Sequence, residues 1–288
     1  MSKLVHRIGG FSGLNTGNIE DCYSNVSMKA DVNSAGFCGE NKGIIRNCLS
    51  KGKIRSKVKE KTCGFCARNA GEQKGCFWVA KDNDSSGEEN WHDWKDAVPD
   101  KELSEKAEKL FEDKDLDNIW SVEKSEQDVK IDLYDSKSEY SVRNNIVEIS
   151  DDKELLKAAE DINNGLVEEN TIFRLTENIN LKGVKWTPIG IDTNTKFSCC
   201  FDGAGFTVKN FRISARENAY AGFFGCISEK GEVYNLNIDL IMQGEGQYSA
   251  AMCAYNDGLI ENCVAKSLVR GSRYSGGFVG HNTGTIRR

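Results

Sequence analysis

Eleven cysteines give this 288-residue sequence its largest set of side chains with reactive chemistry. An odd number of cysteines cannot be fully paired in disulfides within one chain. Cys63 and Cys66 form a single C-x-x-C motif, which would fit zinc or redox chemistry if two further ligands were near. The sequence has no second C-x-x-C motif, and its histidines are scattered at His6, His92 and His281. We therefore predict no metal site and no redox site.

The cysteines recur at fixed positions of a repeat that opens with Gly-Phe, as at Gly10, Gly36 and Gly64. One repeat position, twelve residues after the glycine, holds Cys22, Cys48, Cys76 and Cys263. Another, two residues after it, holds Cys38, Cys66 and Cys253. Strand alternation turns both positions inward, so stacked repeats predict ladders of buried thiols. Disulfides between neighbouring rungs are also compatible with the spacing.

Carboxylates would indicate glycoside chemistry if two of them lay about 5 to 9.5 Å apart. Asp202, in Phe-Asp-Gly-Ala-Gly, falls in a predicted tight turn, where aspartate commonly bonds its own backbone. The other charged repeat positions alternate in sign, which is typical of a solvated face: Glu20, Asp21, Glu40, Arg46, Asp257 and Glu261. No Ser-His-Asp order, nucleophile elbow or phosphate loop is present. We predict a protein that is not an enzyme, with no catalytic, cofactor-binding or metal-binding residues and no cofactor.

Aromatic side chains offer two candidates for ligand contact. Five tyrosines could form a strip that contacts carbohydrate, with incidental placement as the alternative: Tyr23, Tyr220, Tyr248, Tyr255 and Tyr274. The second candidate is Trp91-His92-Asp93-Trp94, for which anchoring of a loop on the scaffold is the favoured interpretation.

Residues 82–93 partly match a calcium-binding loop, with Asp82, Asp84, Ser86 and Gly87 followed by Asp93 at position twelve. Position twelve is Asp rather than Glu, and no helix clearly precedes the run. A solvated acidic loop is therefore the favoured interpretation, and calcium binding stays open.

The repeats predict the elements that would position these residues. Each repeat of 26 to 29 residues holds three short strands and an Asn-x-Gly turn, as at Asn15, Asn41 and Asn69. That length suits one coil of a parallel β-helix, with coils about 4.8 Å apart. We predict an all-β, right-handed parallel β-helix, the hand following the usual crossover chirality.

Three segments are expected. Residues 1–79 form coils that end a β-helix. Residues 80–149 form a small α/β insertion, with the acidic loop, a helix over 99–114, strands at 119–122 and 131–134, and a linker. Residues 150–288 begin with a capping helix from Ser150 to about Gly165 and continue as the first coils of a β-helix.

The repeat Gly-Phe-x-Gly-x-Asn-x-Gly-x-Ile-x-Asn-Cys, together with Trp186–Gly190 and Phe201–Gly205, resembles bacterial proteins that carry GLUG-motif repeats. The resemblance covers residues 8–79 and 150–288, and the third and fifth repeats depart from it. It implies a β-helical, adhesin-like scaffold at the cell surface or outside the cell, with a protein or glycan as ligand. It implies no catalytic residues.

Within that family, residues 99–134 look like the usual end of a repeat domain and residues 150–215 like its start. The order in this chain is thus inverted. Three arrangements explain it: an excerpt of a longer repeat protein, closure within one chain with the 150–288 coils before the 1–79 coils, or head-to-tail stacking between molecules.

Composition excludes some functions. The net charge of −6 gives no reason to expect nucleic acid as a partner, and no apolar run approaches the roughly 18 residues of a membrane span. Residues 1–7 show no signal peptide, so a cytoplasmic location stays open. We expect a non-enzymatic scaffold or adhesion module that could self-associate through open coil ends. The alternative is a carbohydrate-active β-helix enzyme, a polysaccharide lyase or hydrolase.

Overall fold

The structure is a computed structural model of the whole chain. It describes residues 7–25, 28–29, 34–51, 54–55, 62–80, 97–99, 120–124, 129–133, 145–213, 219–241, 247–268 and 273–288. The C-x-x-C motif lies among them, whereas His6, His92, the 82–93 run and Trp91–Trp94 lie outside the described residues.

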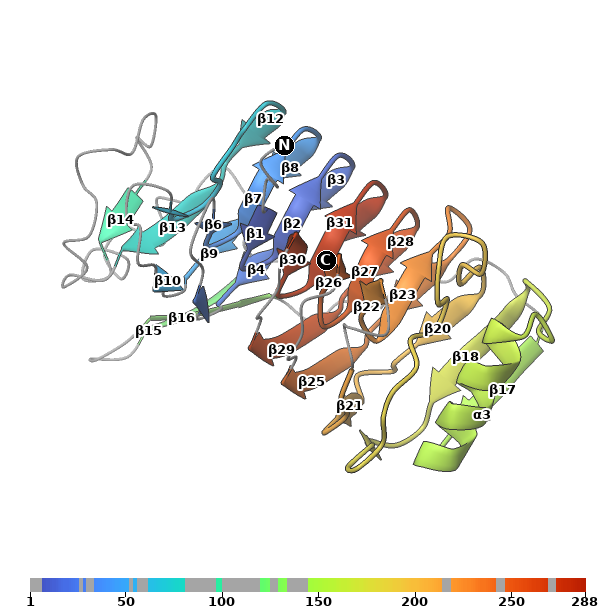
Figure 1. Cartoon of the computed structure of the whole chain (residues 1–288). Coiled ribbons are helices and arrows are strands. Elements are labelled where there is room, and N and C mark those ends of the chain that lie inside the picture. Colours follow the sequence, from blue (N-terminus) through green and yellow to red (C-terminus); the bar gives the residue numbers. More distant parts are fainter. Residues whose placement is uncertain are drawn as a thin grey trace.

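The chain winds into a parallel β-solenoid in which successive coils contribute neighbouring strands to the same sheets (Figure 1). The longest sheet has nine strands. In spatial order they are β12 (Glu72–Lys74), β8 (Ile44–Arg46), β3 (Asn18–Glu20), β32 (Thr285–Arg287), β28 (Leu259–Glu261), β24 (Glu232–Tyr234), β20 (Cys200–Asp202), β18 (Thr171–Leu175) and β17 (Asn145–Ile149). The predicted all-β, parallel β-helical fold is confirmed.

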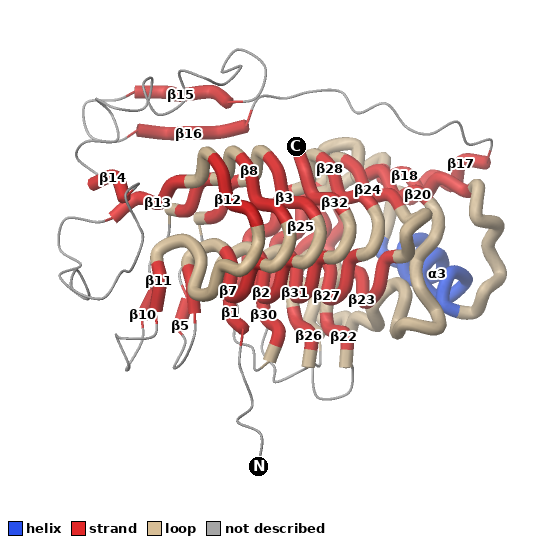
Figure 2. The backbone as a smooth tube through the Cα atoms, turned by 90° about the horizontal axis from the view of Figure 1, so that it is seen from above, coloured by secondary structure: helices blue, strands red, loops and turns tan. Residues whose placement is uncertain are grey.

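Two further sheets run along the same stack, as the view from above shows (Figure 2). One contains β23 (Phe224–Ile227), β27 (Cys253–Asn256), β31 (Val279–Asn282), β2 (Ser12–Asn15) and β7 (Cys38–Asn41). The other contains β11 (Thr62–Cys63), β6 (Ser34–Ala35), β1 (Arg7–Gly9), β30 (Tyr274–Gly276), β26 (Tyr248–Ser249) and β22 (Tyr220–Ala221).

The last strands of the coils form two separate four-stranded sheets. The first is β19 (Ile179–Asn180), β21 (Thr207–Lys209), β25 (Asn237–Ile241) and β29 (Val264–Leu268). The second is β14 (Ala97–Pro99), β13 (Phe77–Ala80), β9 (Leu49–Ser50) and β4 (Tyr23–Ser24). A short parallel pair, β10 (Ile54–Arg55) with β5 (Met28–Lys29), adds to the N-terminal coils.

Within the predicted insertion, β15 (Trp120–Lys124) pairs antiparallel with β16 (Val129–Leu133). These strands overlap the two expected at 119–122 and 131–134. Pro99, where the insertion helix was expected to begin, ends β14 instead. The remainder of that expected helix lies outside the described residues.

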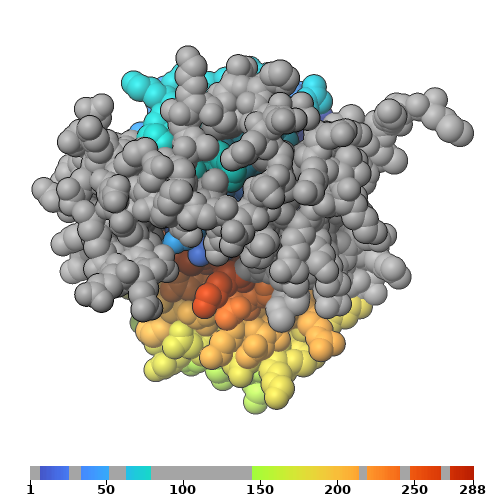
Figure 3. Space-filling view, turned by 90° about the vertical axis from the view of Figure 1, so that its left-hand side faces the viewer, coloured from blue at the N-terminus to red at the C-terminus, as the bar shows by residue number. Residues whose placement is uncertain are grey.

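The two halves of the chain meet inside the stack. β32 pairs with β3, β31 with β2 and β30 with β1, all in parallel. Red and blue strands are therefore neighbours in Figure 1, and orange and red segments show beside blue ones in the view from the β12 end (Figure 3). Of the three arrangements considered, the structure has the 150–288 coils stacked before the 1–79 coils within one chain.

Helix α3 (Asp152–Asn163) closes the β17 end of the solenoid (Figure 2). The Asp151 carboxylate accepts the backbone N–H of Glu154 at 2.9 Å, and the Glu154 carboxylate accepts the backbone N–H of Ser150 at 2.7 Å. These two hydrogen bonds, one of them from the N-cap side chain, fix the start of the helix. Leu155, Ala158, Ala159 and Ile162 are buried against the coils. The predicted capping helix is confirmed.

Phenylalanines of successive repeats stack inside the solenoid. The ring centroids of Phe278 and Phe11 lie 4.8 Å apart, those of Phe11 and Phe37 4.8 Å, and those of Phe37 and Phe65 4.6 Å, with nearly parallel planes. The preceding glycine allows this close stacking. A Cβ atom on Gly10 would lie 1.9 Å from the backbone oxygen of Gly36 in the next coil. Glycine is thus required where one coil turns over another.

The Asn-x-Gly turns form a ladder of side-chain amides. Each Nδ2 donates to the Oδ1 of the asparagine in the next coil, at 2.8 or 2.9 Å, through Asn256, Asn282, Asn15, Asn41 and Asn69. The first four of these side chains are buried. The ladder satisfies buried polar groups in successive coils and continues from Asn282 to Asn15, across the junction of the two chain halves.

We predict that Asn15→Ala destabilises the fold by about 1–3 kcal/mol, because it leaves buried partners on both sides without a hydrogen bond. Asn69→Ala is the matched control. Asn69 is exposed at the end of the ladder, so its loss should cost well under that amount. Urea unfolding of both variants measures the difference. Equal destabilisation by the two substitutions would show that a buried asparagine inside the ladder contributes no more to stability than the exposed one at its end.

Candidate functional site

The cysteines lie inside the solenoid, as predicted, but their order along the stack differs from their order in the sequence. Cys38 and Cys66 are direct neighbours in adjacent coils. Cys253 is separated from Cys38 by Val279 and Ser12, which occupy the same position in the two coils between them. Cys253 therefore shares the inward position of Cys38 and Cys66, as predicted, but the three thiols do not form one uninterrupted ladder. Aligning the repeats shows which residues share a position, but it does not show that the coils of Val279 and Ser12 lie between those of Cys253 and Cys38.

The other cysteine position forms a continuous run of Cys22, Cys48 and Cys76, all buried, on successive coils. Cys263 belongs to the coil before the chain junction and is only partly buried. All eleven cysteines are free thiols.

Burial suppresses the chemistry of most of the thiols whose pKa is shifted; Cys66 is the exception, because a hydrogen bond with Cys38 lowers its pKa. Desolvation by burial raises the pKa of Cys48 and Cys253 well above the usual value, that of Cys226 to about 12 and that of Cys63 to about 11. The nucleophile and metal ligand of cysteine is the thiolate, which is scarce at neutral pH in such sites. Within the described parts of the chain, no three His, Cys, Asp or Glu residues are grouped so as to hold a metal ion.

Asp202 has the structural role expected of it. One carboxylate oxygen accepts the backbone N–H of Ala204 at 2.9 Å and the amide of Asn235 at 3.1 Å. The other accepts Arg174 Nε at 3.0 Å. The side chain is buried, and Ala204 has a φ of 49°, so Asp202 holds a left-handed turn.

Glu40 is not part of a solvated face, which corrects the sequence-based interpretation. Its side chain is only 4% exposed and pairs with Arg7 and, at 3.5 Å, with Lys42. Arg7 contacts it from the adjacent coil, because β1 pairs with β6, the strand that precedes β7. Other charged positions do pair on the surface, as Arg46 does with Glu72 and Arg287 with Glu261.

Four of the predicted tyrosines do come together. Tyr220, Tyr248 and Tyr274 occupy equivalent positions on β22, β26 and β30. Their ring centroids are 5.0 and 4.8 Å apart, and the planes are within 8° of parallel. Arg7 takes the next position of the same row, on β1, and its guanidinium lies 5.0 Å from the Tyr274 ring centroid. Arg7 also donates to the Tyr274 hydroxyl at 3.1 Å.

A second row runs beside the first on the adjacent sheet. Tyr255 on β27 and His281 on β31 are paired residues, with ring centroids 4.9 Å apart and planes near perpendicular. The Tyr255 ring also packs edge-on against Tyr220 and Tyr248. We call this set the tyrosine surface; it comprises Arg7, Tyr220, Tyr248, Tyr255, Tyr274 and His281. All six side chains are partly exposed.

Charged groups border the tyrosine surface. Lys196 Nζ lies 2.5 Å from an Asp257 carboxylate oxygen and 5.7 Å from the Tyr255 ring centroid. Asp257 in turn accepts the Thr283 hydroxyl. Burial raises the pKa of Tyr220, Tyr248 and Tyr255, so these phenols stay neutral and can donate hydrogen bonds. The tyrosine surface therefore offers neutral phenol hydroxyls, with the Lys196–Asp257 ion pair at its border and Arg7, paired with Glu40, at the end of the row.

Tyr23 is not part of the tyrosine surface, because it lies on β4 in a different sheet. Sequence analysis missed Arg7 and took no account of His281 as a partner of Tyr255. His281 could have been found from the repeat alignment. It lies three residues after Phe278, just as Tyr255 lies three residues after Met252, so the two residues share one repeat position. The signal for Arg7 was weaker, since the residue is separated from Tyr274 by almost the whole chain.

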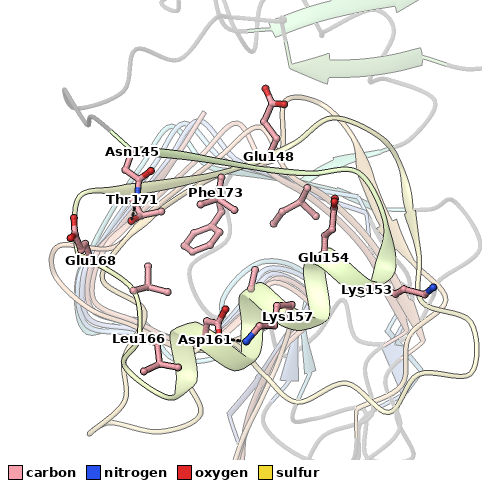
Figure 4. Close-up of a pocket in the computed structure, with 14 residues that line it drawn as sticks. Asn145, Glu148, Lys153, Glu154, Lys157, Asp161, Leu166, Glu168, Thr171 and Phe173 are labelled. Carbon is pink, nitrogen blue, oxygen red and sulfur yellow. Dashed lines mark hydrogen bonds and ion pairs between the residues drawn. The ribbon is translucent and has the colours of Figure 1, made fainter.

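A hollow of 670 Å³ lies at the capped end, between α3 and the strands β17 and β18 (Figure 4). Phe173 points into it from β18, and Lys157 and Asp161 lie along its helical side. Those two charges pair with each other at 2.5 Å. The hollow is the open interior of the coil at the capped end. Its rim is exposed to solvent and carries the Lys157–Asp161 ion pair, and the residues that line it do not form a convergent set of reactive groups.

The fold therefore defines a parallel β-solenoid protein. No protein-family model matches the chain, and no solved structure matches it. One curated protein, described as a Gly-rich membrane protein of Evansella cellulosilytica, is 31% identical over 99 residues. The match covers 31% of this chain and 11% of that protein, so the chain spans about a tenth of the length of its relative. Among the described helices, none is long and apolar enough to cross a membrane.

We predict that His281 makes the fold less stable as pH falls from about 6.5 to about 4. Burial, opposed in part by Asp257 and reinforced by Arg7 and Lys42, lowers its pKa from 6.5 to about 4. In this window the unfolded chain takes up the proton and the folded chain does not, so unfolding becomes more favourable. At about 1.4 kcal/mol per pKa unit, the loss is at most about 3.5 kcal/mol.

His281→Phe retains an aromatic ring and removes the titration. The difference in unfolding free energy between wild type and this variant, measured by urea at pH 7, 5.5 and 4.5, isolates the contribution of His281. Parallel pH profiles for the two proteins would contradict the assignment.

Proposed function

We propose that this protein is a non-enzymatic β-solenoid scaffold that binds a glycan through the tyrosine surface. The observation that carries the proposal is the row of Tyr220, Tyr248 and Tyr274, repeated at the spacing of one coil and continued by Arg7. A row with a constant repeat suits a ligand that is itself a polymer of similar units.

The chemistry of the surface favours a polyhydroxylated ligand. Because the three rings stack on one another, their faces are largely used within the row, and the phenol edges are what they can offer to a ligand. Neutral phenols both donate and accept hydrogen bonds, as sugar hydroxyls do. Tyr255 and His281 add polar ring edges beside the row, and the Lys196–Asp257 pair lies next to Tyr255.

The resemblance to GLUG-repeat proteins supports an adhesin-like role at the cell surface, which is part of the same proposal. The low availability of thiolates and the turn-holding role of Asp202 support a binding function over a catalytic one. A polysaccharide lyase or hydrolase is the alternative, and a binding assay that also follows chain cleavage separates the two.

We predict that the protein binds members of a glycan array and leaves acidic and neutral polysaccharides uncleaved. Tyr248→Ala removes the central ring of the row and should weaken binding about tenfold. Tyr248→Phe keeps the stack and removes one hydroxyl, so it should weaken binding about two- to tenfold. Tyr23→Ala is the control, because Tyr23 lies on another sheet. Binding that survives Tyr248→Ala, or cleavage of any polysaccharide, would overturn the proposal.

Head-to-tail self-association is a second part of the proposal, and the β17 end supports it. β17 is the last described strand of the nine-stranded sheet, and Ile146 and Val147 on it are 49% and 37% exposed. An exposed edge strand with apolar side chains is a template for another strand.

We predict a mass that rises with concentration in sedimentation velocity, and suppression of that rise by Ile146→Lys. Leu166→Lys is the matched control, since Leu166 is 72% exposed and lies outside β17. A single monomeric species at all concentrations would exclude self-association.

A further inference from the structure

The junction of the two chain halves contains a groove one strand wide. In the nine-stranded sheet, β28 and β3 are separated by a single strand, β32. The strand that follows β28 along the chain is β29, and the strand that follows β3 is β4. These two strands end separate sheets, and no described strand lies between them. β29 and β4 are therefore two rungs apart, or about 9.6 Å at the usual inter-strand spacing.

A cavity of 640 Å³ occupies this position. Its walls include Val264, Ala265 and Lys266 of β29 and Tyr23 and Ser24 of β4. Its lining also includes apolar core residues of the neighbouring coils, namely Phe11, Phe278, Ile260 and Ile286. The groove thus combines two strand edges with an apolar floor, as required for the addition of a strand.

The backbone of β29 is oriented to receive a strand. Val264 N–H donates to the Leu236 oxygen at 2.9 Å, toward β25. Successive residues of a parallel strand direct their backbone groups to opposite sides, so Ala265 directs its N–H and C=O toward the groove. On the other wall, the Cys22 and Ser24 oxygens accept from Leu49 and Lys51, which joins β4 to β9 on its far side.

The neighbouring rungs show which side chains fit. The inward positions hold Cys263 and Ala265 in one coil and Cys22 and Ser24 in the other, all small. The outward position opposite a bound strand holds Lys266, whose partner on the other side is Asp239 of β25. The described lining contains Lys266, Arg287 and Arg288 and no Asp or Glu.

We propose that this groove binds an extended segment of a partner polypeptide, which adds one parallel strand between β29 and β4. The segment carries small uncharged residues at its two inward positions and an acidic residue at the outward position beside Lys266. Backbone hydrogen bonds to both walls give affinity, and the inward and outward side chains give specificity. The site is independent of the tyrosine surface and does not rest on glycan binding.

The test uses the peptide Ser-Val-Ala-Glu-Ser-Leu, which copies residues 263–268 with Cys263→Ser and Lys266→Glu. We expect saturable binding, seen as shifts of the Val264 and Ala265 amide resonances and as fluorescence anisotropy of a labelled peptide. A scrambled peptide is the first control. A peptide that keeps lysine at the fourth position should bind about two- to fivefold more weakly, because like charges then face each other.

Ala265→Pro removes the N–H that faces the groove and leaves the bond from Val264 to Leu236 in place, so it should weaken binding about two- to tenfold. Ala265→Ser is the matched control and should bind as wild type does, since serine fills the equivalent positions Ser24 and Ser50. Thermal unfolding of both variants checks that they fold.

A third variant appends the same six residues after Arg288, in register with Cys263–Leu268. It should fill its own groove and no longer bind the free peptide. Equal binding of the scrambled peptide, wild-type binding by Ala265→Pro, or peptide binding by the extended variant would each overturn the proposal.

Discussion

The constraint on which the rest of the structure depends is register between coils. Each coil places the same backbone position over its neighbour about 4.8 Å away, so whatever side chain occupies a position meets its own counterpart. Residues that tolerate self-stacking are therefore the ones that recur. Asparagine bonds to asparagine through its amide, phenylalanine stacks on phenylalanine, and glycine permits the close backbone approach at the corner.

The same constraint organises the surface. Tyr220, Tyr248 and Tyr274 stack because they share one repeat position, and Arg7 extends the row because the N-terminal coil continues the stack. It also affects the thiols of the interior. Cys48 and Cys253 at inward positions are desolvated, and the resulting rise in their pKa keeps them protonated. Under the proposed function, the interior serves stability and recognition falls to side chains at the corners and edges.

Where register is interrupted, edges are exposed. At the β17 end the helix α3 packs its apolar face on the coils, yet β17 itself keeps an open edge with Ile146 and Val147 exposed. At the junction of the chain halves, three strands of the coils pair without a break while β29 and β4 do not. The stability of the junction therefore comes from the continuous Asn282–Asn15 and Phe278–Phe11 contacts beside the groove.

The sequence by itself determined the parallel β-helical fold, the coil length, the capping helix and the inward cysteines, because each depends on a local pattern that recurs at a fixed spacing. It also placed Tyr220, Tyr248, Tyr255 and Tyr274 together as candidates. Only the tertiary structure decided which coils are neighbours. That order joins residue 282 to residue 15, places Val279 and Ser12 between Cys253 and Cys38, and sets β29 opposite β4. Repeat spacing cannot determine such contacts, because equivalent positions are alike in every coil and the choice among stacking orders depends on packing at the junction.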